Sequence, residues 1–293
     1  MLVAVGGGVA VLIAGAGSSS PARGSRGGIA TGRDDHAGRA PAVTRAESAG
    51  PFATGLIGLR FVDHARAIRL ADGKTVPRTL ETYVRYPALG PDSGSDIRDA
   101  PAARGAGPFP LIVFGHGFAV TPTLYARLLA AWAAAGYVVA APVFPLANAN
   151  APGGPNESDL PNQPADMRVV ISRMLAASNA ASGPLSGLFS QRQIAVAGQS
   201  DGGDTALAVA YDPRFRDPRV GAAVILSGAE IPGIGGFQIA PDGPSLLATQ
   251  GTADTINSPS ATNAFYDSAP GPKYRLELLG ASHLPPILPT RLS

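Results

Sequence analysis

The chain has 293 residues, 45% of them hydrophobic, which suits one large α/β domain, or two small ones, with a substantial core. It contains no cysteine, and this excludes disulfides, thiolate metal sites and cysteine nucleophiles. Five of the 23 basic and three of the 21 acidic residues lie within residues 1–50, which leaves 18 of each sign in the remainder. A neutral body without a basic patch argues against nucleic-acid binding.

The first 50 residues differ in character from the rest. Residues 1–16 form an apolar run that is too short for a comfortable membrane span. We interpret residues 1–16 as a signal peptide with Ala14-Gly15-Ala16 as the cleavage site; a short membrane anchor is the alternative. Residues 17–50, rich in Gly, Ala, Ser and Arg, are predicted to be a flexible linker. We therefore expect a secreted protein whose mature form has no stable membrane span.

The ordered domain is expected to cover residues 51–293 and to begin with two strands, 56–62 and 80–86. Residues 90–108 carry Gly, Pro, Asp and Ser and predict an exposed loop. The apolar run 110–114 then has the pattern of a buried parallel strand.

A helix is predicted next, with Thr121 as its N-cap, Pro122 in its first position and Gly136 as its stop. Its apolar face consists of Leu124, Tyr125, Leu128, Leu129 and Trp132.

From residue 137 onward, strands alternate with helices. Strands are expected at 137–141, 194–197, 220–226, 245–249 and 274–279, and helices at 166–177, 205–210 and 260–268. This alternation predicts a mostly parallel sheet of about eight strands flanked by helices.

The sequence Gly198-Gln199-Ser200-Asp201-Gly202 lies between an apolar strand-like run and a helix-like run. A serine on such a sharp strand-to-helix turn is exposed for attack, and small flanking residues let strand and helix approach closely. We therefore expect Ser200 to be a nucleophile.

A serine nucleophile needs a base, and the chain has four histidines. His283 follows the last expected strand, where it can reach over the carboxyl edge of the sheet, and it is our candidate base. His116, in Gly115-His116-Gly117-Phe118, is the alternative, although a structural role in orienting that loop is expected for it.

The orienting carboxylate is expected after a strand, between serine and histidine in chain order. Asp254 satisfies this, with Glu230 as its competitor and Asp242 as a weaker third choice. Asp201 and Asp204 are expected to complement the dipole of the helix after Ser200. The backbone N–H groups of Asp201 and Phe118 are the expected oxyanion donors.

These motifs, in this order, resemble the α/β-hydrolase superfamily over residues 52–290. Arg78 to Ala88, together with the His116-Gly117-Phe118 loop, resembles its dienelactone-hydrolase-like branch, which includes platelet-activating-factor acetylhydrolase-like and cutinase-like polyester hydrolases. The resemblance implies an α/β-hydrolase fold and a serine ester hydrolase without cofactor or metal, with residues 51–293 as its catalytic domain.

The sequence departs from that branch in three respects. Dienelactone hydrolases use a cysteine nucleophile, and this chain has none. Cutinase-like enzymes usually carry a tryptophan on the loop after the sixth strand, whereas residues 227–232 lack one. A further helix usually follows the histidine loop, but prolines at 285, 286 and 289 cannot continue a regular helix. We therefore expect a shortened reading frame or a domain without this helix.

The expected substrate is a small-molecule or polymeric ester. The expected pocket residues are His116, Gly117, Phe144, Gln199, Phe237 and Leu284. A core position is an equal alternative for the phenylalanines and Leu284. The alternatives are a cutinase-like polyester hydrolase or lipase, an amide, lactone or thioester hydrolase on the same fold, and a catalytically inactive binding protein.

Overall fold

The computed structural model describes residues 52–70, 72–228, 236 and 239–284. The predicted signal peptide and linker, Glu230, Phe237 and the proline-rich residues 285–289 lie outside the described residues. No helix among the residues searched is long and apolar enough to span a membrane.

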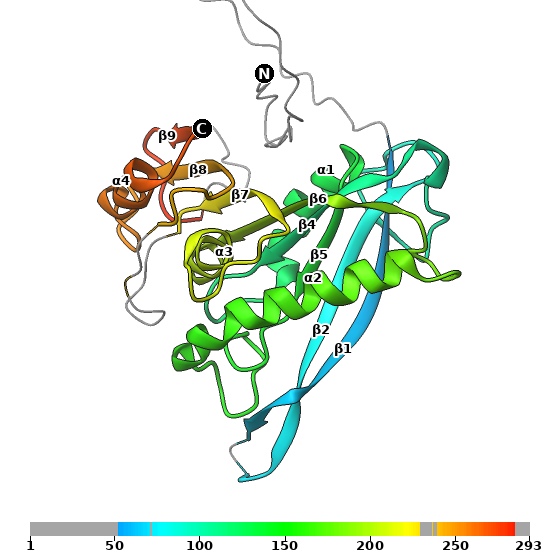
Figure 1. Cartoon of the computed structure of the whole chain (residues 1–293), viewed down its shortest axis with the longest axis horizontal. Helices are drawn as coiled ribbons and strands as arrows, with labels where there is room; N and C mark the ends of the chain where they lie inside the picture. The colour runs from blue at the N-terminus through cyan, green and yellow to red at the C-terminus, as the bar shows by residue number, and fades with distance from the viewer. Residues whose placement is uncertain (1–51, 71, 229–235, 237–238, 285–293) are drawn as a thin grey trace, which may run out of the picture. The chain divides into compact units, whose positions relative to one another are not determined.

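The described chain forms a nine-stranded, mostly parallel sheet in the order β3-β1-β2-β5-β4-β6-β7-β8-β9 (Figure 1). The nine strands are β1 (Ala53–Arg69), β2 (Thr75–Ala88), β3 (Asp96–Arg98), β4 (Phe109–Gly115), β5 (Val138–Pro142), β6 (Phe189–Gln199), β7 (Val220–Leu226), β8 (Ser245–Gly251) and β9 (Lys273–Leu278). The pairs β1–β2 and β2–β5 are antiparallel, and all strands from β5 to β9 run parallel in the sheet. This arrangement confirms the predicted fold class, with one strand more than expected.

The helices are α1 (Ala126–Ala134), α2 (Gln163–Asn179), α3 (Asp201–Tyr211) and α4 (Pro259–Ser268), and the short 3-10 turns are η1 (Arg104–Ala106), η2 (Pro122–Tyr125) and η3 (Glu157–Asn162). The sheet order advances one way from β4 to β5 and the other way from β5 to β6 and beyond. Because crossovers are right-handed, α1 covers one face, and α2 and α3, which pack on each other, cover the opposite face.

Strand β4 and the second half of β6 are apolar runs because both of their faces are covered, and their buried side chains include Val113, Phe114, Val196 and Ala197. These two strands are neighbours at the point where the direction of the chain along the sheet reverses. In open α/β sheets, ligands bind at the carboxyl ends of the strands at such a point.

A buried ion-pair cluster fastens the β1–β2 hairpin, drawn in blue and cyan in Figure 1, to η3 and to the first turn of α2. The guanidinium of Arg78 donates to both carboxylate oxygens of Asp159 and of Asp166 at 2.6–2.9 Å. Arg66 donates to Asp166 and to Asp63. This cluster satisfies the buried charges of Arg78 and Asp166, which would otherwise be costly to desolvate.

Candidate active site

Ser200 lies directly after β6 and is the N-cap of α3. Its backbone has φ 55° and ψ −129°, a conformation that costs energy for a residue with a side chain. The turn is possible because its flanking residues are glycines: a Cβ on Gly198 would lie 2.0 Å from the carbonyl oxygen of Gly202. A Cβ on Gly202 would lie 2.1 Å from the carbonyl oxygen of Gly115, so β4, β6 and α3 meet here without room for a methyl group.

The loop after β4 comes up against Ser200. A Cβ on Gly117 would lie 3.2 Å from Cβ of Ser200, so only a glycine allows this approach without displacement. The N–H of Gly117 donates to Oη of Tyr125 at 3.0 Å, and the N–H of Ala119 donates to the carbonyl oxygen of Ala147 at 2.8 Å. Both amides are therefore engaged in the fold, and Phe118 lies between them.

His116 fixes this loop from below. The ring is fully buried; Nδ1 donates to the carbonyl oxygen of Gly117 at 2.7 Å, and Nε2 accepts from the N–H of Phe144 at 3.0 Å. Burial lowers the pKa of His116 to about 4, so the ring is neutral at pH 7 and both nitrogens are occupied by backbone groups. This geometry fits the structural role expected for His116.

Asp254 and His283 are in direct contact. Nδ1 of His283 donates to Oδ2 of Asp254 at 2.9 Å, and both side chains are buried. Oδ1 of Asp254 accepts from the N–H groups of Ile256 and Asn257, and Oδ2 also accepts from the amide of Gln250 at 3.1 Å. Asp254 is thus fully hydrogen-bonded, as a buried carboxylate requires.

The loops that carry these two residues are packed backbone to backbone. A Cβ on Gly251 would lie 2.3 Å from the carbonyl oxygen of Ala281. The N–H of Ala253 donates to that carbonyl at 2.9 Å, and the N–H of Gly280 donates to the hydroxyl of Thr252 at 2.8 Å. Asp242, by contrast, is exposed and pairs with Arg216 at 2.6 Å.

Nε2 of His283 has Gln199 as its partner. The amide nitrogen of Gln199 lies 3.1 Å from Nε2, and among the described residues no hydrogen bond joins His283 to Ser200. The structure therefore brings Asp254, His283, Gln199 and Ser200 into one region but leaves the serine–histidine bond unmade. Such bonds are often formed only when substrate is bound.

The remaining expected pocket residues lie in different environments. Phe144 is fully buried in the hydrophobic core and contacts the ring of His116, which places it behind the loop rather than on a substrate wall. Gln199 is also buried, and its amide is occupied by protein groups. Leu284 is 39% exposed and Phe118 is half-buried.

Three residues of this region were missed from the sequence: Tyr125, Gln250 and Asn257. For Tyr125 the sequence does hold a signal. It lies on the apolar face of the expected helix, and a buried tyrosine hydroxyl needs a hydrogen-bond partner. Gln250 and Asn257 gave no signal, because they act through contacts with Asp254 and Ser227 that only the folded chain creates.

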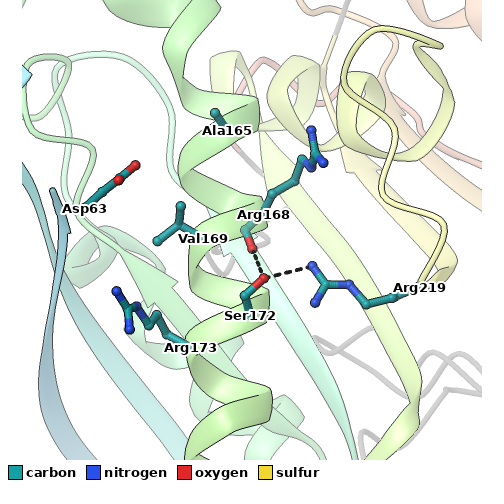
Figure 2. Close-up of a pocket in the computed structure, with 7 residues that line it drawn as sticks. All are labelled: Asp63, Ala165, Arg168, Val169, Ser172, Arg173 and Arg219. Atoms are coloured by element: carbon teal, nitrogen blue, oxygen red, sulfur yellow. Dashed lines mark hydrogen bonds between the residues drawn. The ribbon is translucent and has the colours of Figure 1, made fainter. Parts of the chain in front are cut away.

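A cleft of about 450 Å³ lies elsewhere, beside α2 (Figure 2). Figure 2 shows Ser172 donating to the carbonyl oxygen of Arg168 and accepting from Arg219. The complete lining is Asp63, Ala165, Arg168, Val169, Ser172, Arg173 and Arg219. No lining residue belongs to the region around Ser200. Among the described residues there is also no cluster of His, Cys, Asp and Glu suited to a metal ion.

Comparison with known proteins agrees with this fold. Residues 99–222 match the model of the chlorophyllase family, an α/β-hydrolase esterase family. A ferulic acid esterase from Streptomyces cinnamoneus superposes with a TM-score of 0.54 at 21% identity, covering 78% of this chain and 73% of that chain. No curated protein matches the sequence.

These comparisons show an α/β-hydrolase fold, and the chlorophyllase model matches less than half of the chain. The family match spans β4, the loop of Gly117, β6 and Ser200 but ends at residue 222, before Asp254 and His283.

Proposed function

We propose that this α/β hydrolase is a serine carboxylic ester hydrolase in which Ser200, His283 and Asp254 act as nucleophile, base and orienting acid. The observation that carries the proposal is the coincidence of a strained serine at the β6–α3 turn with a buried Asp254–His283 hydrogen bond on the same sheet edge. The matches to esterases support the ester as substrate.

In the proposed reaction, Oγ of Ser200 attacks the ester carbonyl carbon while its proton passes to Nε2 of His283. The carbonyl electron pair moves to oxygen, and the N–H groups of Asp201 and Phe118 stabilise that negative charge. His283 then protonates the departing alcohol, which leaves an acyl group on Ser200. A water molecule, deprotonated by His283, releases the acid and restores the serine. Asp254 holds the proton on Nδ1 and stabilises the imidazolium.

In this mechanism the loop after β4 donates to the oxyanion through the N–H of Phe118, because the neighbouring amides already have acceptors. The amides of Gly117 and Ala119 already donate within the fold. Asp201 supplies the second donor from the first position of α3, where backbone N–H groups lack helical partners. Secretion is part of the proposal, and it rests on the apolar residues 1–16 alone.

The test is hydrolysis of p-nitrophenyl esters of graded acyl length by wild type and by Ser200→Ala. Loss of activity by at least about 10⁴-fold in a folded variant is expected, because the nucleophile itself is removed. Labelling of Ser200 by a fluorophosphonate is the second readout. A folded wild type that neither hydrolyses esters nor labels would overturn the proposal.

A further inference from the structure

A chain of hydrogen bonds connects the loop after β4 to the base. The N–H of Gly117 donates to Oη of Tyr125 at 3.0 Å, and the hydroxyl of Tyr125 donates to Oε1 of Gln199 at 2.8 Å. Nε2 of Gln199 lies 3.1 Å from Nε2 of His283 and donates to the carbonyl oxygen of His283 at 3.3 Å. Tyr125, Gln199 and His283 are all buried, so water does not compete for these bonds.

The direction of each of these hydrogen bonds follows from groups that can only donate or only accept. An amide N–H such as that of Gly117 can only donate, so the hydroxyl of Tyr125 accepts there and gives its own proton to Gln199. A carbonyl such as that of His283 can only accept, so the nitrogen of the Gln199 amide faces His283. That nitrogen therefore donates to Nε2 of His283, and the ring proton lies on Nδ1, facing Asp254.

We propose that Gln199 is a positioning residue of the active site: its amide ties His283 to Tyr125 and the oxyanion loop, and it occupies Nε2 of His283 until Ser200 takes its place. This inference rests on the proposed serine esterase function. The protonation state that the amide favours, with Nε2 free of hydrogen, is the state in which His283 can accept the proton of Ser200.

The amide also opposes the next state of the base. When Nε2 carries a proton, two N–H groups face each other, so the bond to Gln199 is lost and the imidazolium is free to approach Ser200 or the leaving alcohol. The bond from Gln199 to the carbonyl oxygen of His283 does not depend on that proton, so it keeps the loop of His283 in place through the chemical step. Since it is buried and fully engaged, we expect no contribution from it to ground-state binding of substrate.

The variants are Gln199→Met, which keeps the length but removes both polar atoms, and Gln199→Glu, which keeps the acceptor for Tyr125 but places an acceptor opposite Nε2. Tyr125→Phe removes only the connecting hydroxyl. Gln163→Met is a matched control, because Gln163 is another buried glutamine that bonds Thr205 on α3. Tyr86→Phe is the control for Tyr125, since its buried hydroxyl donates to the carbonyl oxygen of Ala100.

For Gln199→Met we expect kcat for p-nitrophenyl ester hydrolysis to fall by about 10–100-fold, with KM within about threefold of wild type, as for an interaction that acts on the chemical step. Tyr125→Phe is expected to show a smaller loss of the same kind. The double variant is expected to be no worse than Gln199→Met, because the two residues act as one unit. Both controls are expected to keep wild-type kcat.

The pH profile of kcat/KM separates positioning from general damage. Donation to Nε2 favours the neutral ring of His283. When that donation is removed in Gln199→Met, we expect the acid limb of the kcat/KM profile to move to higher pH. In Gln199→Glu, where an acceptor faces Nε2, the limb is expected to move further, by at least about one unit. The acidic groups around this hydrogen-bond chain are the same in every variant. Asp254 contacts His283, Asp201 acts electrostatically on Tyr125, and Glu157 acts on Asp201.

An active wild type with kcat and acid limb unchanged in Gln199→Met and Tyr125→Phe would overturn this inference and leave the proposed function standing. A change confined to KM would also overturn it, because it would mean direct contact with substrate. A folded wild type without hydrolysis or fluorophosphonate labelling would overturn the proposed function first. If Gln199→Met does not fold, Tyr125→Phe alone decides between these outcomes.

Discussion

The two halves of the candidate site are built in different ways. Ser200 is positioned by backbone: a strained turn, three glycines in contact and two adjacent buried strands. The ring of His283 is oriented by side chains, through hydrogen bonds to Asp254 and Gln199, on a loop whose backbone packs against Gly251. The first half is made by the backbone of paired, buried strands, whereas the second depends on side-chain contacts between groups 29 and 84 residues apart. The nucleophile is therefore tied to the stability of the sheet, and the base can be displaced while the sheet stays folded.

The largest effect is expected where the nucleophile half is broken. In Gly202→Ala the added Cβ would meet the carbonyl of Gly115 at 2.1 Å and the carbonyl of His116 at 2.7 Å, so β4 and α3 must separate. We expect a loss of at least about 3 kcal/mol in the free energy of unfolding, measured by urea denaturation, and no esterase activity.

The control for this variant is Gly58→Ala, where a Cβ meets no atom within 4 Å. Its stability is expected to stay within about 0.5 kcal/mol of wild type. Near-wild-type stability of Gly202→Ala would show that the β6–α3 turn at Ser200 tolerates the added methyl group, and it would remove the contrast between the two halves of the site.

A smaller loss of stability, but a severe loss of activity, is expected on the base half. In Gly251→Ala the Cβ would lie 2.3 Å from the carbonyl of Ala281 and 2.6 Å from that of Ser282, and this displaces the loop of His283. Because this loop lies beside the edge strand β9, we expect a cost of only about 1–2 kcal/mol. A displacement of about 1 Å is enough to lower kcat about 100-fold.

The test of the contrast is how the loss of stability compares with the loss of kcat in each variant. Urea denaturation and kcat are compared for Gly251→Ala and Gly202→Ala under the same conditions. If Gly251→Ala lost stability and activity together, as Gly202→Ala is expected to do, the base would be as dependent on the sheet as the nucleophile.

The same contrast explains how much could be predicted from the sequence. Most strands from β4 to β8 are predictable because a buried parallel strand is an apolar run, although only the second half of β6 has this pattern. The turn at Ser200 is predictable because its residues are consecutive. β3 was missed, since three residues within a Gly, Pro and Ser-rich segment carry no period. Phe144 was offered for the pocket because an aromatic residue after a strand has the same pattern whether it faces substrate or the core.

The hydrogen-bond partners of the base were beyond the sequence for a physical reason. Gln199 was considered as a pocket residue, but its partners come from η2 and from the loop after β9. Which of these meet depends on backbone packing at Gly251 and Gly117, and packing is determined by the whole fold. Chain order alone predicts that Asp254 and His283 pair, but only the folded backbone shows that they meet.

The smallest effect is expected at Asp201, the first residue of α3 after Ser200. Burial, with the charge of Glu157 adding to it, raises the pKa of Asp201 to about 6 from 3.8, and Oδ2 has no hydrogen-bond partner among the described residues. As pH rises through 3.8 to 6, the unfolded chain releases this proton before the folded chain does, so stability falls. The penalty is absent below about pH 4 and complete above about pH 6.

In Asp201→Asn this penalty disappears. A shift of about two pKa units corresponds to about 3 kcal/mol, and the lost attraction of a carboxylate to the N-terminus of α3 returns up to about 1 kcal/mol. We expect a net gain of about 1–2 kcal/mol at pH 7.5 and none at pH 4, from urea denaturation at both values. Glu157→Gln should give part of this gain with the same pH dependence. An equal gain at both pH values would mean that the Asn side chain acts by packing. Since Ser200 is positioned by backbone, kcat at pH 7.5 should then fall by no more than about threefold, whereas a larger loss would place the side chain of Asp201 in the chemistry.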